Sequence, residues 1–178
     1  MSIDVLLRIM PPPPSPIETG ARSWLEIETE IGTRLPQDYK EYIEKYGSGR
    51  IGDFIAIFNP FSANRHTNIL DQIPKQTEIL NHFKRTSPSE CPYPIFPEAA
   101  GLLPFGGTDN GDRLYWVTDG EPDSWWIAVN ESRGPTFSEH KCDMTQFLAD
   151  ILTLKTVCAV FPDDFPDGDT SFKPSERG

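Results

Sequence analysis

The segment from Pro36 to Gly47 constrains the fold of this chain more than any other. Four large apolar residues in it recur at the spacing of one face of an α-helix: Tyr39, Tyr42, Ile43 and Tyr46. Pro36 suits the start of such a helix because its fixed φ is already helical, and Gly47 suits the position just past its end. An aromatic ridge on an amphipathic helix is typical of a face packed into a core, so we expect a globular domain built around it.

Similar patterns elsewhere predict a mixture of helices and strands. Further helices are predicted over residues 19–31, 75–85 and 144–154. Strands are predicted over residues 54–58, 102–105, 113–118, 125–130 and 136–139, the last four as a β-meander. Turns are predicted over residues 49–52 and 106–111, and a long irregular connection over residues 87–97, which hold four prolines. Helices and strands together indicate one α+β domain.

The two ends of the chain differ in composition from its middle. Residues 1–16 hold five prolines and are predicted to form an N-terminal arm, either a spacer, a packed arm or a ligand for an aromatic groove. Residues 161–178 are acidic and rich in proline and glycine, which favours a surface arm or disorder. The domain itself is therefore predicted to cover residues 17–160.

The charge and cysteine content narrow the classes of function. There are 16 basic and 27 acidic residues, a net charge of −11, which disfavours nucleic acid and anionic membrane and favours basic partners, or else only confers solubility. Three scattered cysteines without a CxxC pair predict neither a disulfide framework nor a zinc site. No stretch has the length of a membrane span or the pattern of a signal peptide, so we expect a cytoplasmic protein.

The glycine-rich segment 106–112 is the most conspicuous loop. It lacks the lysine of a phosphate-binding loop and carries Asp109 and Asp112, whose carboxylates would repel an anion. A β-turn with Asn110-Gly111 supplying the positive φ is one interpretation, and a metal site or a contact with a partner are others.

Catalytic patterns are missing from the sequence. His66, His82 and His140 stand in no metal-binding motif, and no signature supports His140 and Cys142 as a nucleophile pair. We therefore expect no enzyme and no cofactor. On the predicted strand 125–130, Trp125 should face the core, whereas Trp126 faces the other way, either beneath a helix or exposed as an anchor for a partner.

The order of these landmarks resembles the SUKH superfamily, the Smi/Knr-like proteins, and within it an actinobacterial branch. The resemblance covers about residues 24–154 and is carried by short motifs: Trp24-Leu25, Ile31-Gly32, the run from Leu35 to Lys40, Tyr46 to Gly49, Phe58 to Phe61, Leu103 to Gly106, Gly111-Asp112, Leu114 to Trp116 and Phe147-Leu148. It implies a twisted, largely antiparallel sheet flanked by helices, with no catalytic residues to carry over. Bacterial members are mainly immunity proteins that neutralise toxins, often nucleases or deaminases, whereas fungal members are signalling scaffolds.

From the acidity and this resemblance we predict a protein that plugs the basic cleft of a toxin. The predicted contacts are turn carboxylates with one aromatic anchor: Asp53, Asp109, Asp112, Asp119, Glu121, Asp123 and Trp126. Two alternatives stay open at this point. One is a regulatory scaffold that docks through its two ends, and the other is a metal-dependent enzyme that uses Asp109 and Asp112.

Overall fold

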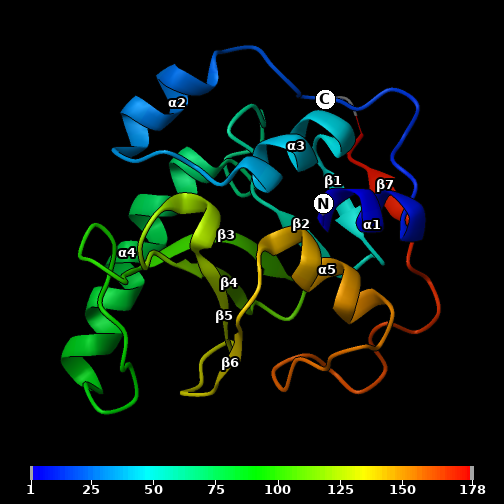
Figure 1. Ribbon diagram of the computed structural model, residues 1–178. Helices are drawn as coiled ribbons and strands as arrows, with labels where there is room; N and C mark the ends of the chain where they lie inside the picture. The colour runs from blue at the N-terminus through cyan, green and yellow to red at the C-terminus, as the bar shows by residue number, and fades with distance from the viewer. Residues whose placement is uncertain (1, 177–178) are drawn as a thin grey trace.

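A computed structural model describes residues 2–176 of the chain (Figure 1). The helices are α1 (Ser2–Ile9), α2 (Trp24–Ile31), α3 (Gln37–Tyr46), α4 (Ile69–Thr86), α5 (Met144–Leu152) and the short 3-10 helix η1 (Pro122–Ser124). The strands are β1 (Gly49–Ile51), β2 (Ile55–Ile57), β3 (Leu102–Thr108), β4 (Arg113–Val117), β5 (Trp126–Asn130), β6 (Phe137–His140) and β7 (Phe172–Pro174). In this range of residues no helix is long and apolar enough to cross a membrane.

These strands form a single open antiparallel sheet in the order β6-β5-β4-β3-β2-β1-β7. The β-meander predicted in the second half of the chain supplies β3 to β6, and a β-bulge at Phe105 interrupts the pairing of β3 with β4. The predicted α+β class with a largely antiparallel sheet is confirmed.

Alternation along the strands divides the core into two layers, because successive side chains of a strand point to opposite faces. On one face the sheet packs against α1, α3 and α5 through Leu103, Phe105, Leu114, Trp116, Ile127 and Val129. On the other face Leu102, Tyr115, Val117 and Ala128 pack beneath α4 and the connection that follows it. Figure 1 shows α4 on the side of the sheet away from α5. Helices therefore flank both faces of the sheet.

The predicted aromatic helix is α3, and its four apolar residues are all buried. The Tyr39 ring packs edge-on against Trp116, with 5.0 Å between ring centroids, and its hydroxyl donates a hydrogen bond to the Phe58 carbonyl oxygen at 2.6 Å. Gly47 follows the helix with a φ of 67°, and a Cβ there would lie 2.1 Å from the Ile17 carbonyl oxygen. Only glycine meets both demands.

Helix α1 is not anticipated by the sequence. Its eight residues are too few to form a stable helix alone, but Ile3 and Leu6 are buried against α3 and α5. The proline run that follows is thereby held against the domain, since Met10 is fully buried. The packed-arm alternative for this end is the one that the structure has.

The acidic C-terminal segment is likewise part of the fold. β7 pairs with β1, so residues 49–51, predicted as a turn, are instead a strand with neighbours on both sides. Phe165 packs on Phe54, and Phe172 packs on Tyr46. The sequence did not predict these contacts, because aromatic side chains scattered among prolines and acids find partners only in three dimensions.

Several element boundaries also differ from the prediction. α2 begins at Trp24 rather than residue 19, because Ser23 and Glu26 form a reciprocal capping box. α4 begins at Ile69 with Asn68 as its N-cap and accommodates Pro74 in its second turn. β3 runs through Gly106 and Gly107, which were predicted to lie in a turn.

Candidate functional site

The predicted contact residues do not form one site, because strand β4 separates them. Asp109 and Asp112 precede β4, whereas Asp119, Glu121 and Asp123 follow it. The seven steps of nearly extended chain from Asp112 to Asp119 span on the order of 20 Å. The structure therefore has two candidate regions at opposite ends of the sheet.

At the first end the carboxylates are paired with basic side chains. Arg50 forms an ion pair with Asp109 and also donates to the Asp53 carbonyl oxygen, while Lys173 forms an ion pair with Asp53. The two acidic side chains are exposed, but their charge is locally compensated. A basic partner would have to compete with these internal pairs.

Asp112 is a structural residue. It is 3% exposed, and its carboxylate accepts hydrogen bonds from the Thr108 hydroxyl at 2.7 Å and the Ser132 amide at 3.0 Å. Asp112 thus fixes the β3–β4 turn to the β5–β6 turn and is not available to a partner. The segment 106–112 is therefore partly strand and partly β-turn, closed by the Gly111 amide on the Thr108 carbonyl oxygen.

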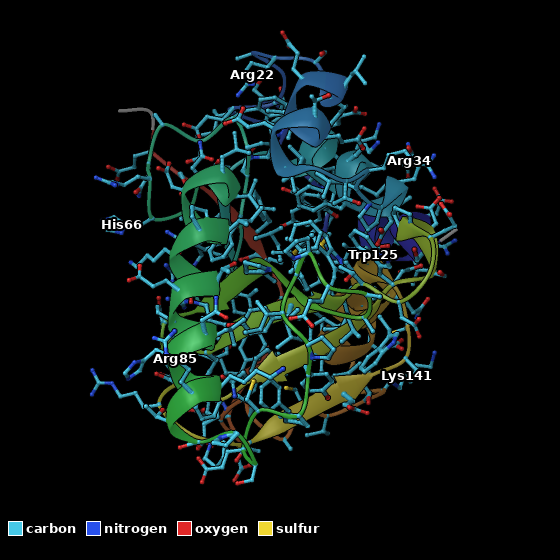
Figure 2. The ribbon with its side chains drawn as sticks, turned by 90° about the vertical axis from the view of Figure 1, so that its left-hand side faces the viewer. Arg22, Arg34, His66, Arg85, Trp125 and Lys141 are labelled. Atoms are coloured by element: carbon cyan, nitrogen blue, oxygen red, sulfur yellow. The ribbon has the colours of Figure 1, made fainter. Side chains whose placement is uncertain are left out.

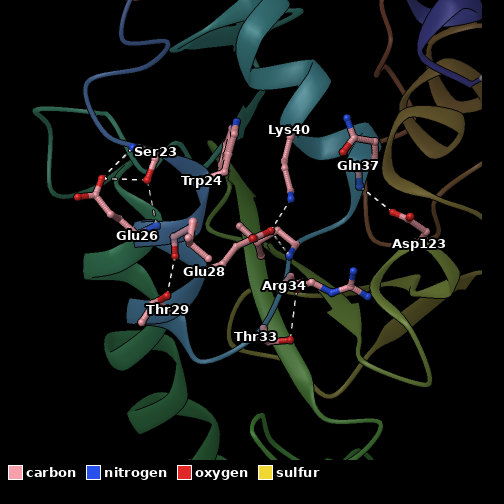
Figure 3. Close-up of polar contacts among 12 residues, drawn as sticks. Ser23, Trp24, Glu26, Glu28, Thr29, Thr33, Arg34, Gln37, Lys40 and Asp123 are labelled. Atoms are coloured by element: carbon pink, nitrogen blue, oxygen red, sulfur yellow. Dashed lines mark hydrogen bonds and ion pairs between the residues drawn. The ribbon is translucent and has the colours of Figure 1, made fainter.

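At the second end the acidic side chains of the β4–β5 connection are exposed. Glu121 pairs with Arg34, which Figure 2 shows beside this connection. The Asp123 carboxylate accepts a hydrogen bond from the Gln37 amide at 2.7 Å, at the first residue of α3 (Figure 3). This contact attaches η1 to a helix N-terminus, where a negative charge is favourable.

Two helix starts next to η1 add further carboxylates, which makes this end strongly acidic. The carboxylates of these helix starts and of η1 line a hollow of about 310 Å³. The four carboxylates are Asp38, Glu41, Asp123 and Asp143, and the other lining residues are Ser2, Ile3 and Gln37. No lysine or arginine of residues 2–176 lines the hollow. We call this set of four carboxylates the acidic hollow.

Burial gives Asp38 an unusual proton affinity. Desolvation raises the pKa of its carboxyl group to about 6, and the nearby charge of Asp143 acts in the same direction. The Thr145 amide donates to Asp38 Oδ2 at 2.9 Å and opposes this shift. Asp143 caps α5 by accepting from the Gln146 amide at 2.8 Å. A cationic side chain entering the hollow would favour the charged form of Asp38.

Trp126 is half-buried, so its side chain is neither fully covered beneath a helix nor fully exposed. Its ring packs edge-on near Tyr93, and the Lys141 ammonium lies 2.8 Å from the centroid of the Trp126 ring. The ring is therefore already in contact with a cation of its own chain. Trp125 is buried in the core as predicted, and its indole N–H donates to the Gly120 carbonyl oxygen at 3.1 Å.

Titratable groups outside the hollow do not assemble into a catalytic arrangement in the described part of the chain. The His140 ring lies 3.0 Å from the Ser138 hydroxyl, and burial lowers the pKa of His140. Burial raises the pKa of the Cys142 thiol to about 11, which disfavours a nucleophilic thiolate. Within residues 2–176 no three His, Cys, Asp or Glu side chains lie close enough together to hold a metal ion.

Sequence reasoning missed three members of the acidic hollow: Asp38, Glu41 and Asp143. By position alone, Asp38 is an acid in the first turn of a predicted helix, which complements the helix dipole, and Asp143 directly precedes another predicted helix. An aspartate or asparagine just before a helix is a capping signal, but it does not say that two such helix starts meet. The tertiary contact between α3 and α5 decides that.

Comparison with known proteins gives one match. A family model described as SUKH_6, SMI1-KNR4 cell-wall, matches residues 22–148. No curated protein and no solved structure matches the chain significantly. The matched range includes every residue from α2 through the middle of α5, and thus covers well over half of the chain. The chain therefore belongs to the SUKH_6 (SMI1-KNR4 cell-wall) family.

Proposed function

We propose that this protein is a non-catalytic immunity protein that binds a cognate bacterial toxin and blocks its basic active-site cleft. Membership of the SUKH family supports the class of function, since the family is commonly associated with immunity proteins. The acidic hollow is the observation that carries the mechanism, because four carboxylates line it without a lining lysine or arginine.

The proposed contact surface is a revised one. It consists of the hollow (Asp38, Glu41, Asp123 and Asp143) and the neighbouring exposed acid Asp119. A nuclease or a nucleic-acid deaminase must attract phosphates, so its cleft is basic. An acidic surface that enters such a cleft competes with the phosphates and accelerates association by electrostatic steering. Trp126 follows η1 on the chain, but its ring packs with the layer on the other face of the sheet and is covered by Lys141, so it is not part of this surface.

Asp53, Asp109 and Glu121 are less suited to this role, because they form ion pairs with Lys173, Arg50 and Arg34, respectively. The alternative of a regulatory scaffold relied on the two ends of the chain as docking segments. Those ends contribute α1 and β7 to the fold, which favours a partner surface on the domain itself. An actinobacterial origin stays a prediction from the resemblance.

A pair of charge reversals tests the proposal. Glu41→Lys places a cation in the hollow, whereas Glu78→Lys makes the same change of net charge on exposed α4, on the other face of the sheet. The toxin is first sought among the proteins encoded by neighbouring genes. Binding to its toxin domain is then measured by surface plasmon resonance, and protection by co-expression in bacteria. We expect Glu41→Lys to weaken binding at least about tenfold and Glu78→Lys to leave it unchanged. Equal effects of the two variants would refute the proposed surface, and turnover of a substrate by the purified protein would refute the function.

A further inference from the structure

A second hollow lies on the opposite face of the sheet from the acidic hollow. It is a groove of about 470 Å³ between the second half of α4 and the ends of β4 and β5. One wall is apolar and consists of Ile79, Leu80 and Phe83 of α4. Ile79 is 51% exposed, which is unusual for a large apolar side chain of this protein. The volume falls within the range of roughly 300–1,000 Å³ that is typical of small-molecule sites.

The floor of this groove holds Arg113 and Tyr115, which are two residues apart on β4 and therefore share a face. Arg113 is half-buried, and its Nη1 donates only to main-chain carbonyl oxygens, those of Gly111 at 3.3 Å and Asp112 at 3.1 Å. Its Nε is buried without a hydrogen-bond partner. Among residues 2–176, no carboxylate forms an ion pair with Arg113, although the chain has eleven more acids than basic residues.

Tyr115 supplies a second polar group without a partner. Tyr115 is 1% exposed and lines the groove. Its hydroxyl forms no hydrogen bond with any of the residues 2–176, and the same is true of the Tyr42 hydroxyl, whereas the Tyr39 and Tyr46 hydroxyls each donate one. Unlike Arg113 Nε, the Tyr115 hydroxyl is not completely buried, so a ligand in the groove can reach it. An arginine without a carboxylate and a tyrosine without an acceptor, side by side in one groove, both lack the same kind of partner.

We propose that this groove binds a small carboxylic acid with an aromatic or aliphatic body. The carboxylate accepts hydrogen bonds from the Tyr115 hydroxyl and the Arg113 guanidinium, and the apolar body packs against Ile79, Leu80 and Phe83. Glu90, Glu131 and Arg133 also line the groove, so selection of the carboxylate rests on the Arg113 guanidinium, which pairs best with planar anions of this shape. The groove and the acidic hollow lie on different faces, so this inference does not depend on the proposed toxin partner.

The experiment is a titration of the full chain with 3-phenylpropionate, followed by ¹H–¹⁵N NMR and calorimetry. We expect a dissociation constant of about 1 mM or tighter, as is usual for a small fragment in a preformed site. Amide signals of Gly111 and Ser132, at the groove, should shift. The uncharged 3-phenylpropionamide should bind at least about tenfold more weakly, because it cannot form the charge-assisted pair.

Variants decide whether the named groups bind the acid. Tyr115→Phe removes a hydroxyl that has no partner in the free protein, so we expect an unchanged urea midpoint and about tenfold weaker binding. Arg113→Gln removes the positive charge and should weaken binding at least as much. Tyr42→Phe is the matched control, since it deletes a buried tyrosine hydroxyl in the other core layer and should bind as the wild type does.

Three results would overturn the proposal. The first is no binding of 3-phenylpropionate at 20-fold the expected constant. The second is equal binding of the acid and the amide, or wild-type affinity in both Tyr115→Phe and Arg113→Gln. The third is binding of the tripeptide Gly-Gly-Phe, with its free C-terminal carboxylate, in the absence of binding by 3-phenylpropionate, which would assign the groove to a chain end of another protein instead of a small molecule.

Discussion

The hydroxyl of Tyr46 donates a hydrogen bond to the main-chain carbonyl oxygen of Met10 at 2.6 Å, and both residues are completely buried. This bond joins the last turn of α3 to the residue that precedes the proline run. A second contact, from the Ser2 hydroxyl to Asp143 at 3.0 Å, joins the start of α1 to the N-cap of α5. The N-terminal segment is thus fastened at both of its ends, and α1 becomes a wall of the acidic hollow through Ser2 and Ile3.

The first prediction concerns the contribution of α1 to stability. Leu6 is fully buried between α1 and the core, so Leu6→Ala should lower the free energy of unfolding by about 2–5 kcal/mol through lost burial and a cavity. Urea denaturation measures this. Leu25→Ala is the control, because Leu25 is 75% exposed, and it should change stability by less than about 0.5 kcal/mol. A similar small effect at Leu6 would mean that α1 is not docked.

The second prediction concerns the C-terminal edge of the sheet. The Gly52 amide donates to the Ser171 carbonyl oxygen at 2.9 Å, and the Ser175 amide donates to that of Ser48 at 2.9 Å. Deletion of residues 169–178 removes β7 and leaves β1 as an unpaired edge. Hydrogen exchange at the Gly52 amide should accelerate markedly, while the Ile127 amide in β5 should keep its protection. Unchanged exchange at Gly52 would contradict the pairing of β7 with β1.

Such deletions have a consequence for functional tests. Removal of both chain ends takes away α1, β7 and their aromatic contacts, so loss of toxin protection by the truncated protein would report unfolding as readily as a lost docking segment. The paired charge reversals at Glu41 and Glu78 avoid this difficulty, because both alter side chains and leave the backbone intact.

The third prediction is a pH dependence of stability that arises from Asp38. Burial raises its folded-state pKa from 3.8 to about 6, so the folded protein holds this proton more tightly than the unfolded chain does. The stabilisation is therefore complete below about pH 4 and is lost as pH rises through 6, with a cost of up to about 3 kcal/mol above that pH. Asp38→Asn can still accept from the Thr145 amide and should remove this dependence.

Urea unfolding of the wild type and Asp38→Asn at pH 4, 5, 6 and 7 measures the effect. The variant should be the more stable protein at pH 7, and the two should converge near pH 4. Subtraction of the two curves cancels other groups that titrate in the same range. Parallel curves across the whole range would show that Asp38 is not held in a desolvated state.

The fourth prediction concerns the kinetics of partner binding. If the acidic hollow steers a basic cleft, the association rate should fall steeply between 50 and 500 mM salt, as the Debye length shortens from roughly 14 Å to 4 Å. The dissociation rate should change much less. Stopped-flow mixing with the toxin domain gives both rates, and a salt-insensitive association rate would remove electrostatic steering from the mechanism.

Local patterns sufficed for the elements that carry their own periodicity. The aromatic face of α3 and the alternation along β4 and β5 depend only on residues that are close together in the sequence. These elements were predicted within one or two residues of their observed bounds. The turn with Asn110-Gly111 is also local, because its backbone requires a positive φ, observed at 88° for Gly111. The prediction of an α+β domain followed from these parts.

Neighbouring residues along the chain are thus enough to define the periodic elements, the acidity and the family resemblance. Which residues meet depends on the folded chain. In the folded chain Asp112 is buried, and Asp53 and Asp109 are paired with basic side chains. One hollow is lined by carboxylates from α3, η1 and α5, namely Asp38, Glu41, Asp123 and Asp143. The physical reason is that helix and strand patterns depend on residues a few positions apart, whereas a shared hollow, the pairing of β7 and the docking of α1 depend on contacts between segments up to 143 residues apart.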